Sequence, residues 1–203
     1  MEDISAELDR EGRIIDDLLS MSRLEEGVSS LNISEINLND WMEQALRRVG
    51  PIAKAEGVEI SFESFRPVSA KVDEIKLTLA ITNIVENAIK YNKEGGFIKI
   101  SLNADYHYFY IKIEDSGIGI PREAIPHLFD RFYRVEKDRS RESGGTGLGL
   151  SISKQIINLH HGVIRVHSEL GEGTIFAIRI PLEYKEDEKI EEDSDEEPDD
   201  SEK

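Results

Sequence analysis

The amino-acid sequence predicts an α+β fold, a two-layer α/β sandwich in which strands form one layer and helices the other. Alternation of apolar and polar residues over 97–103 and 106–115, and again over 163–168 and 173–180, indicates two hairpins. Amphipathic helix patterns separate the strands along the chain. The 203 residues are enough for one domain of ordinary size with appendages.

An amphipathic helix precedes the sandwich, within residues 1–27. Its apolar stripe consists of Ile4, Leu8, Ile15, Leu18 and Leu19. Because a lone helix of this length is marginal in water, the stripe needs a partner. That partner is either another helix, in a hairpin or an intermolecular bundle, or the main domain itself. Gly27 ends the helix, and residues 28–37 form a linker.

The helical layer begins with residues 37–57. The N-cap is expected near Asn39 or Asp40, because both residue types accept hydrogen bonds from the first free amides of a helix. The helix either stops at Gly50-Pro51 or continues past a kink to the end of this segment.

Two short strands, at 58–63 and 68–72, come next. Asp73 then caps a long helix over 74–92, which the sequence KEGG ends. The last helix is expected over 148–159, between the two hairpins.

The composition excludes several classes of function. The formal net charge of −17 argues against nonspecific binding to nucleic acid or to an anionic lipid surface. Cysteine is absent, which rules out disulfides, thiolate metal sites and a thiol nucleophile and fits a reducing compartment. No apolar run is long enough to cross a bilayer and the N-terminus has no signal pattern, so we expect a soluble, cytoplasmic chain.

Negative charge is concentrated at the C-terminus. Residues 185–203 contain 12 acidic residues and 3 lysines. Such a segment has too little apolar surface to offset its chain entropy, so we expect it to be disordered. It serves either as a docking or solubilising segment or as a solvated terminus without a specific function.

A glycine-rich segment precedes the last helix. Gly144, Gly145, Gly147 and Gly149 fall within six positions, and glycine lets backbone amides approach a ligand closely. The helix that begins near Leu148 adds unpaired N–H groups and the positive end of its dipole, which favour phosphate. The segment matches neither a P-loop nor a dinucleotide-binding fingerprint. A flexible hinge or a helix-start loop that binds nothing is the alternative.

One face of the long helix carries polar side chains. Asn83, Asn87 and Lys90 are at positions i, i+4 and i+7, and Tyr91 follows them. Two amides and an ammonium in line can place an oxygen ligand on Mg²⁺ and a cation beside phosphate. Alternatively, these residues are only the solvated face of the helix. Its buried stripe is expected to consist of Leu77, Ile81, Val85 and Ala88.

A carboxylate ends the strand over 106–115. Period two places Asp115 on the same face as Ile111 and Ile113, in line with core side chains. A buried carboxylate needs a partner, and the exocyclic amine of a purine would provide one. The glycines of SGIGI, directly after it, leave room for a flat ligand. The alternative is an ordinary Asp-Ser-Gly turn at the end of a strand.

A basic segment over 121–143 separates the two glycine clusters. Its cations are Arg122, Arg131, Arg134, Lys137, Arg139 and Arg141. Long irregular segments inside compact domains are often lids, and a cationic lid suits a polyphosphate ligand. Solvated loop charge is the competing interpretation.

The order of these motifs resembles one family. NxxxNAxKY, DxGxG, FxRFYR, GTGLGL and SELGEGTIF follow one another as in the ATP-binding domain of sensor histidine kinases, within the GHKL superfamily of gyrase, chaperone, kinase and mismatch-repair ATPases. The likeness covers about residues 1–184 and implies a mixed sheet covered on one face by helices. It implies that residues 38–184 are the ATP-binding catalytic domain and residues 1–27 the second helix of a dimerisation hairpin whose first helix is missing. The acidic tail over 185–203 lies outside the likeness.

The resemblance also implies roles for single residues. Asn87 is similar to the asparagine that holds magnesium, with Asn83 assisting it, and Asp115 to the carboxylate that reads adenine. Arg134 resembles the arginine that meets the terminal phosphate. The aromatic anchors of the lid would be Phe129, Phe132 and Tyr133. The implied nucleotide contacts are Asn83, Asn87, Lys90, Tyr91, Asp115, Gly117, Gly119, Ile120, Arg134, Gly145, Thr146, Gly147, Leu148, Gly149, Leu150 and Thr174, with catalytic roles for Asn87, Lys90 and Arg134.

The five histidines are His107, His127, His160, His161 and His167. In the family, the phosphoacceptor is on the helix that precedes the one expected at the N-terminus here. None of the five is therefore expected to accept phosphate, and the resemblance implies that His160 and His161 are structural.

The resemblance implies a protein-histidine kinase of two-component systems that uses Mg²⁺ and ATP. It would transfer the γ-phosphoryl group to a histidine on a helix that this chain lacks. The implied partners are that helix, the receiver domain of a response regulator and a second copy of the parent kinase, with no nucleic acid. A membrane would be reached only through missing N-terminal regions. Two alternatives stay open: a serine kinase of the anti-sigma type, and a nucleotide-sensing or scaffolding module without productive transfer.

Overall fold

The computed structural model describes residues 31–135 and 146–185, together with residues 11, 12, 15, 18, 19 and 22. These six N-terminal residues are helical, as predicted. Most of that helix, part of the lid including Lys137, Arg139 and Arg141, Gly144 and Gly145 of the glycine-rich segment, and the acidic segment after Lys185 lie outside the described residues. Within the described part of the chain, no helix combines the length and the apolar character that a membrane span requires.

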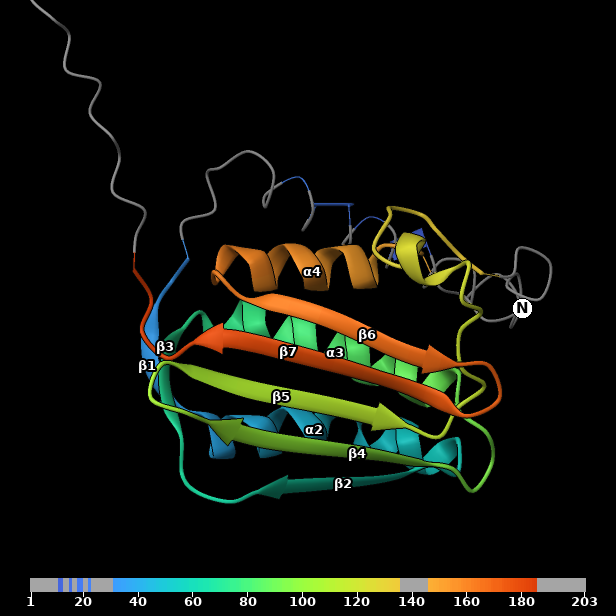
Figure 1. Cartoon of the computed structure of the whole chain (residues 1–203), viewed down its shortest axis with the longest axis horizontal. Helices are drawn as coiled ribbons and strands as arrows, with labels where there is room; N and C mark the ends of the chain where they lie inside the picture. Colours follow the sequence, from blue (N-terminus) through green and yellow to red (C-terminus); the bar gives the residue numbers. More distant parts are fainter. Residues whose placement is uncertain are drawn as a thin grey trace, which may run out of the picture.

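The strand layer is a five-stranded mixed sheet (Figure 1). Its strands are β2 (Glu59–Ser64), β4 (Phe97–Ala104), β5 (Tyr108–Asp115), β6 (Val163–Glu169) and β7 (Gly173–Pro181), in the order β2-β4-β5-β7-β6. β2 is parallel to β4, and every other neighbouring pair is antiparallel. Both predicted hairpins, β4–β5 and β6–β7, are therefore confirmed, and the pairing of β5 with β7 joins them into one sheet.

Three helices cover one face of this sheet, namely α2 (Leu38–Ala55), α3 (Glu74–Lys90) and α4 (Gly149–Leu159) (Figure 1). Their apolar sides supply the core together with β4, β5 and β7. The predicted buried stripe of α3, made of Leu77, Ile81, Val85 and Ala88, is buried. The α+β two-layer sandwich is confirmed. On its helix-covered face, one side of α3 lies near the end of β5 and the start of β7.

α2 begins earlier than expected. Its N-cap is Asn37, whose Oδ1 accepts hydrogen bonds from the amides of Asn39 at 2.9 Å and Asp40 at 3.2 Å. The cap therefore lies two residues before Asn39, the nearer of the two positions around which it was expected, and the Asn39 side chain bonds elsewhere. Its Nδ2 donates to Ser64 Oγ at 2.7 Å, and its Oδ1 accepts from the Val68 amide at 2.9 Å.

α2 also continues through Pro51 and ends at Ala55, so the longer of the two predicted alternatives is correct. Proline lacks an amide proton and destabilises the interior of a helix. Val49 and Ala53, on either side of Pro51, are both buried in the core. Packing of this face against the sheet therefore holds the last turn in place.

A short strand was not predicted. β1 (Ser34–Asn37) lies in the segment expected to be a linker and pairs antiparallel with β3 (Ser69–Val72) as a separate two-stranded sheet. Three of its four side chains are exposed, so it has no apolar pattern. Its partner strand, more than 30 residues away in sequence, supplies the hydrogen bonds that define it.

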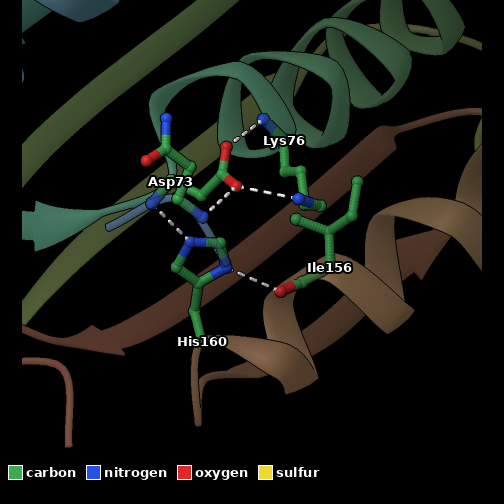
Figure 2. A network of polar contacts seen from close by, with 5 residues as sticks. Asp73, Lys76, Ile156 and His160 are labelled. Carbon is green, nitrogen blue, oxygen red and sulfur yellow. Dashed lines mark hydrogen bonds and ion pairs between the residues drawn. The ribbon is translucent and has the colours of Figure 1, made fainter. Parts of the chain in front are cut away.

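Asp73 caps α3, as predicted, and also holds the segment that leads into the domain (Figure 2). Its Oδ1 accepts from the Lys76 amide at 3.0 Å, and its Oδ2 accepts from Lys76 Nζ and from the Asn32 amide, both at 2.9 Å. Burial by itself raises the pKa of Asp73, but the hydrogen bonds from Lys76 and Asn32 outweigh it and lower the pKa below the ordinary value.

His160 connects this cap to the end of α4 (Figure 2). Its Nε2 accepts a hydrogen bond from the Asp73 amide at 3.0 Å, and its Nδ1 donates to the Ile156 carbonyl at 2.8 Å. These contacts define a neutral ring with its proton on Nδ1. Burial lowers the pKa of His160 below its ordinary value. His160 is structural, as expected.

His161 is placed differently from its neighbour. It is exposed, its ring stacks on Tyr184 with centroids 5.2 Å apart, and its backbone has a φ of 55°. Of the two consecutive histidines, His160 therefore has the clearer structural role.

Candidate functional site

Four elements meet at one end of the molecule: the C-terminal half of α3, the end of β5, the start of β7 and the first turn of α4. Asp115 is in register with Thr174 across the β5–β7 pair. The carbonyl of Tyr91, which caps α3, accepts a hydrogen bond from the Ile118 amide at 3.0 Å. Asn83 of α3 donates to the carbonyl of Gly149 at 3.2 Å. Hydrogen bonds therefore connect the end of α3 with the turn after β5, and the middle of α3 with the first turn of α4.

Asp115 is buried at the end of β5, with 8% of its surface exposed, in line with Phe109, Ile111 and Ile113. Its Oδ1 accepts from the amides of Gly117 at 2.8 Å and Thr174 at 3.2 Å. Burial raises the pKa of Asp115 above the ordinary value, and these two hydrogen bonds oppose that rise.

The second oxygen of Asp115 is available to a ligand. Oδ2 has no hydrogen-bond partner among the residues that the structure describes. No fully buried polar side-chain atom in the described ranges is left without a partner, so Oδ2 reaches the surface. A recessed carboxylate with one free acceptor oxygen can bind a ligand N–H group.

The glycines after Asp115 are required by contacts within the protein. A Cβ on Gly117 would collide with the Tyr91 carbonyl and lie 2.8 Å from Asp115 Oδ1. Gly119 has a φ of 69°, and a Cβ there would collide with the Glu169 carbonyl. Room for a flat ligand, the reason expected from the sequence, is therefore not the whole explanation for these glycines. The turn must also pack against α3 and the β6–β7 connection.

The polar face of α3 divides into two parts. Asn83 is hydrogen-bonded to the glycine-rich segment through Gly149. Asn87 is partly exposed and its carboxamide has no hydrogen-bond partner among the described residues. Lys90 Nζ lies 5.2 Å from the centroid of the Tyr91 ring. Asn87 and Lys90 thus lie on the same side of α3, toward its C-terminal end.

The glycine-rich segment is described from Thr146 onward. Gly147 has a φ of 76°, and its carbonyl accepts from the Phe132 amide at 3.0 Å. A Cβ on Gly147 would lie 2.9 Å from Phe132 Cα, so glycine is needed where the segment crosses the lid. Leu148 is fully buried, and its amide donates to Thr146 Oγ1 at 3.2 Å. The segment is thereby fixed at the first turn of α4, where Gly149 and Leu150 follow it.

The aromatic residues expected to anchor the lid differ in their surroundings. Phe129 packs against the core and has Lys154 Nζ 5.1 Å from its ring centroid. Phe132 is exposed and has a φ of 60°, a value that is uncommon for a residue with a side chain. Arg134 is half-buried near the end of the described part of the lid. Strained backbone where the lid meets the glycine-rich segment is typical of functional sites.

Two residues of this region were not singled out from the sequence, although both belong to the SELGEGTIF motif. Gly173 has a φ of 116°, and a Cβ there would collide with the Asp115 carbonyl. The hydroxyl of Ser168 contacts Ile120, Gly173 and Thr174. The register of β6 with β7 brings Ser168 opposite Thr174, and no local pattern reveals that pairing.

Comparison with known proteins identifies the family of this chain. Residues 72–184 match the family described as histidine kinase-, DNA gyrase B-, and HSP90-like ATPase. The chain is 37% identical over 180 residues to the sensor histidine kinase RppB of Synechocystis sp., covering 86% of this chain and 40% of that protein. It is also 37% identical over 186 residues to the sensor histidine kinase WalK of Bacillus subtilis, covering 90% of this chain and 30% of WalK. The chain therefore spans less than half the length of these relatives.

Solved structures share the fold. The catalytic domain of histidine kinase ThkA aligns with a TM-score of 0.67 and 27% identity, covering 75% of this chain and 97% of that domain. Histidine kinase ThkA in complex with the response regulator protein TrrA aligns with a TM-score of 0.69 and 26% identity, covering 88% of this chain and 49% of ThkA. With its motifs, its mixed sheet and these relatives in agreement, the chain belongs to the histidine kinase-, DNA gyrase B- and HSP90-like ATPases, and within them it is a catalytic domain of the sensor histidine kinase type.

Proposed function

We propose that this chain binds Mg-ATP where α3, β5, β7 and α4 meet, and that it directs the γ-phosphoryl group to a histidine in two-component signalling. The observation that carries the proposal is the Asp115 carboxylate, which is recessed at the end of the sheet and keeps one oxygen for a ligand. Family membership supplies ATP as the nucleotide.

Asp115 reads the adenine base in this proposal. The 6-amino group of adenine is a hydrogen-bond donor, and Oδ2 of Asp115 is a recessed acceptor without a partner in the described part of the chain. A charged acceptor that is shielded from water strongly favours a base that donates over one that does not. Thr174 and the turn from Gly117 to Ile120 surround this carboxylate.

The phosphates lie toward α3 and the first turn of α4 in this proposal. The N-terminal turn of α4 has no side-chain cap among the described residues and carries the positive end of a helix dipole. Lys90 and Arg134 add positive charge that would stabilise the terminal phosphate as it transfers. Catalysis in such a site consists mainly of positioning and charge stabilisation, which these residues supply without a covalent step.

The residues of α3 also suit a magnesium ion. Across residues 31–135 and 146–185, no three His, Asp or Glu side chains are grouped to hold a metal. Mg²⁺ bound with a nucleotide takes most of its ligands from phosphates and water, so one amide oxygen from the protein is sufficient. Asn87, partly exposed and without another partner in the described ranges, is the residue that would hold it. The ion would supply neutralisation of phosphate charge.

The partners of the domain form the second part of the proposal. The side chains of Ile15, Leu18 and Leu19 are exposed, which supports a role for this helix in pairing with another helix, such as the one bearing the phosphoacceptor histidine. We assign residues 1–27 to that hairpin in a homodimeric kinase, 38–184 to the catalytic domain and 185–203 to an acidic tail. ThkA has been solved with the response regulator TrrA, which supports a receiver domain as the final phosphate acceptor.

Calorimetric titration of the chain with ATP, with and without Mg²⁺, tests the binding step. Asn87→Ala should abolish most of the gain in affinity that Mg²⁺ provides, while Asp115→Asn should weaken binding in both conditions because an amide presents a donor to the 6-amino group. Binding that is equal in all three proteins would overturn the assignment of this site.

Incubation with γ-labelled ATP tests the transfer step. The chain alone should remain unlabelled, and a separately supplied dimerisation hairpin that carries a phosphoacceptor histidine should become labelled. Label that appears on the chain itself, in the absence of the hairpin, would contradict the expectation that none of its five histidines accepts phosphate.

A further inference from the structure

Three residues from three strands lie side by side at the base end of the site. Ser168 of β6 is in register with Thr174 of β7, which is in register with Asp115 of β5. Residues that are paired across neighbouring strands have their side chains on the same face of the sheet. The side chain of Ser168 is therefore on the face that carries Asp115, separated from it by one strand.

The Ser168 hydroxyl has three polar contacts. Its Oγ accepts from the Ile120 amide at 2.9 Å, donates to the Gly173 carbonyl at 2.8 Å and lies 2.9 Å from Thr174 Oγ1. A hydroxyl has one proton and two lone pairs. Since a carbonyl can only accept, the arrangement that satisfies all three contacts has Ser168 donating to Gly173 and Thr174 donating to Ser168.

This arrangement fixes the hydrogen-bonding character of the base pocket. Thr174 gives its hydroxyl proton to Ser168 and its amide proton to Asp115 Oδ1. Thr174 Oγ1 and Asp115 Oδ2 are then both left as acceptors. Two such acceptor oxygens suit an exocyclic amino group, which has two protons to donate, and disfavour a carbonyl oxygen in its place.

Ser168 also holds the turn that borders Asp115. The Ile120 amide bonds to Ser168 across 48 residues of sequence, and the Gly171 amide bonds to the Ile118 carbonyl at 2.7 Å. The turn that contains Gly117 and Gly119 is thus fastened at two points, to the end of β6 and to the β6–β7 connection. Removal of the Ser168 hydroxyl would release one of these points and free the Thr174 proton.

We propose that Ser168 is a positioning residue that makes the pocket selective for 6-amino over 6-oxo purines, by holding the Thr174 hydroxyl as an acceptor and fixing the Ile120 amide. This inference rests on the proposed function, because it assumes that a purine binds against Asp115. Ser168 itself acts through Thr174 and Ile120 and need not touch the base.

Competitive titration of the 203-residue chain with ATP and with ITP, both with Mg²⁺, tests the inference. ITP carries a carbonyl oxygen where ATP carries the amino group. The measured quantity is the dissociation constant of ITP divided by that of ATP, so a high ratio means selectivity for ATP. Ser168→Ala should lower this ratio by about threefold to tenfold, the equivalent of one neutral hydrogen bond, because the released Thr174 hydroxyl can donate to the carbonyl of ITP. Ser168→Thr, which keeps the hydroxyl, should retain the wild-type ratio.

A purely structural role for Ser168 gives a different result, since a loosened fold weakens ATP and ITP equally. An unchanged ratio in Ser168→Ala would therefore overturn the inference, even if both affinities fall. Should Ser168→Ala fail to fold, Ser168→Cys provides the same test, because it keeps the size but weakens the hydrogen bonds; its ratio must also fall.

Failure of the inference can be distinguished from failure of the proposed function. If the wild-type chain binds ATP, loses affinity on Asp115→Asn and keeps its ratio in the Ser168 variants, only the role of Ser168 is wrong. If the wild-type chain binds neither nucleotide, the proposed site itself is wrong.

Discussion

Asn83 of α3 donates a hydrogen bond to the Gly149 carbonyl at 3.2 Å, across 66 residues of sequence. This contact joins the helix that carries Asn87 to the first turn of α4. Ser153 on α4 reinforces the connection, because its hydroxyl lies 2.9 Å from the carbonyls of both Ala80 and Gly149. The two asparagines one turn apart on α3 thus have different roles: Asn83 connects two helices, and Asn87 is proposed to bind a ligand.

Replacement of each asparagine should separate these tasks. Asn83→Ala should lower the free energy of unfolding by about 1 kcal/mol, the usual net value of such a hydrogen bond, and should also weaken ATP binding because the glycine-rich segment is released. Asn87→Ala should change stability by less than about 0.5 kcal/mol, since its carboxamide has no partner among the described residues. Urea unfolding of both variants measures the difference, and equal losses of stability would contradict it.

The buried carboxylate of Asp115 is expected to lower the stability of the protein while it increases its affinity for ATP. Burial raises its pKa, so the carboxylate form is disfavoured in the folded protein relative to the unfolded chain at pH values above that pKa. Asp115→Asn removes the buried charge and can still accept from Gly117 and Thr174 through its amide oxygen. We expect its melting temperature to equal or exceed the wild-type value, while its affinity for ATP falls at least about tenfold. A clear loss of thermal stability in this variant would show that the carboxylate is structural.

His160 should contribute strongly to stability. Its removal leaves the buried Asp73 amide without a partner and opens a cavity between α3 and α4, so His160→Ala should cost about 2–4 kcal/mol. His161→Asn is the matched control, because residue 161 is exposed and asparagine tolerates its positive φ. The control should lower the unfolding free energy by only about 0.5–1 kcal/mol, since the contacts of the His161 ring with Tyr184 and with the Lys185 carbonyl lie at the surface. Chemical denaturation of the two variants measures both values.

The stability should depend on pH through His160. Its pKa is lowered in the folded protein, so the unfolded chain binds the proton more readily. The stabilisation is therefore complete above the unfolded value of 6.5 and is lost as the pH falls below it toward the folded pKa. Asp73, which faces the ring, does not add to this window, because its lowered pKa places its own loss of stability below 3.8.

Unfolding free energies measured from about pH 8 to about pH 5 for the wild type and His160→Ala test this dependence. The wild type should lose stability more steeply than the variant across that range. Parallel curves would mean that His160 has the same pKa in the folded and unfolded states.

Glycine 119 should be intolerant of a side chain. In Gly119→Ala, a positive φ adds about 1 kcal/mol of strain, and the collision of the new Cβ with the Glu169 carbonyl adds about 1–3 kcal/mol more. Gly95→Ala shows the strain alone, because Gly95 has a similar φ of 71° but no atom within 4 Å of the added Cβ, so the difference between the two variants measures the collision. Thermal unfolding should show the larger loss for Gly119→Ala, and similar losses would mean that the turn can move away from the β6–β7 connection.

Several features of this protein follow from local sequence patterns. The burial of the α3 stripe, the cap at Asp73 and the burial of Asp115 in line with Ile113 were all predictable, because helix and strand periods of 3.6 and 2 place side chains on defined faces. The two hairpins were predictable for the same reason, with their turns marked by short polar segments. Motif order then indicated the family, which the comparisons confirm.

Other features depend on pairings between distant segments. Asn37 rather than Asn39 caps α2 because Ser64 and Val68 occupy the Asn39 side chain, and β1 exists only because β3 lies beside it. The contact of Ser168 with Ile120 likewise requires the register of β6 on β7. A buried polar group forms a hydrogen bond with whichever partner the folded chain brings within reach. Neighbouring residues that could each cap a helix, and residues that meet across several strands, therefore acquire their partners only when the whole sheet has formed.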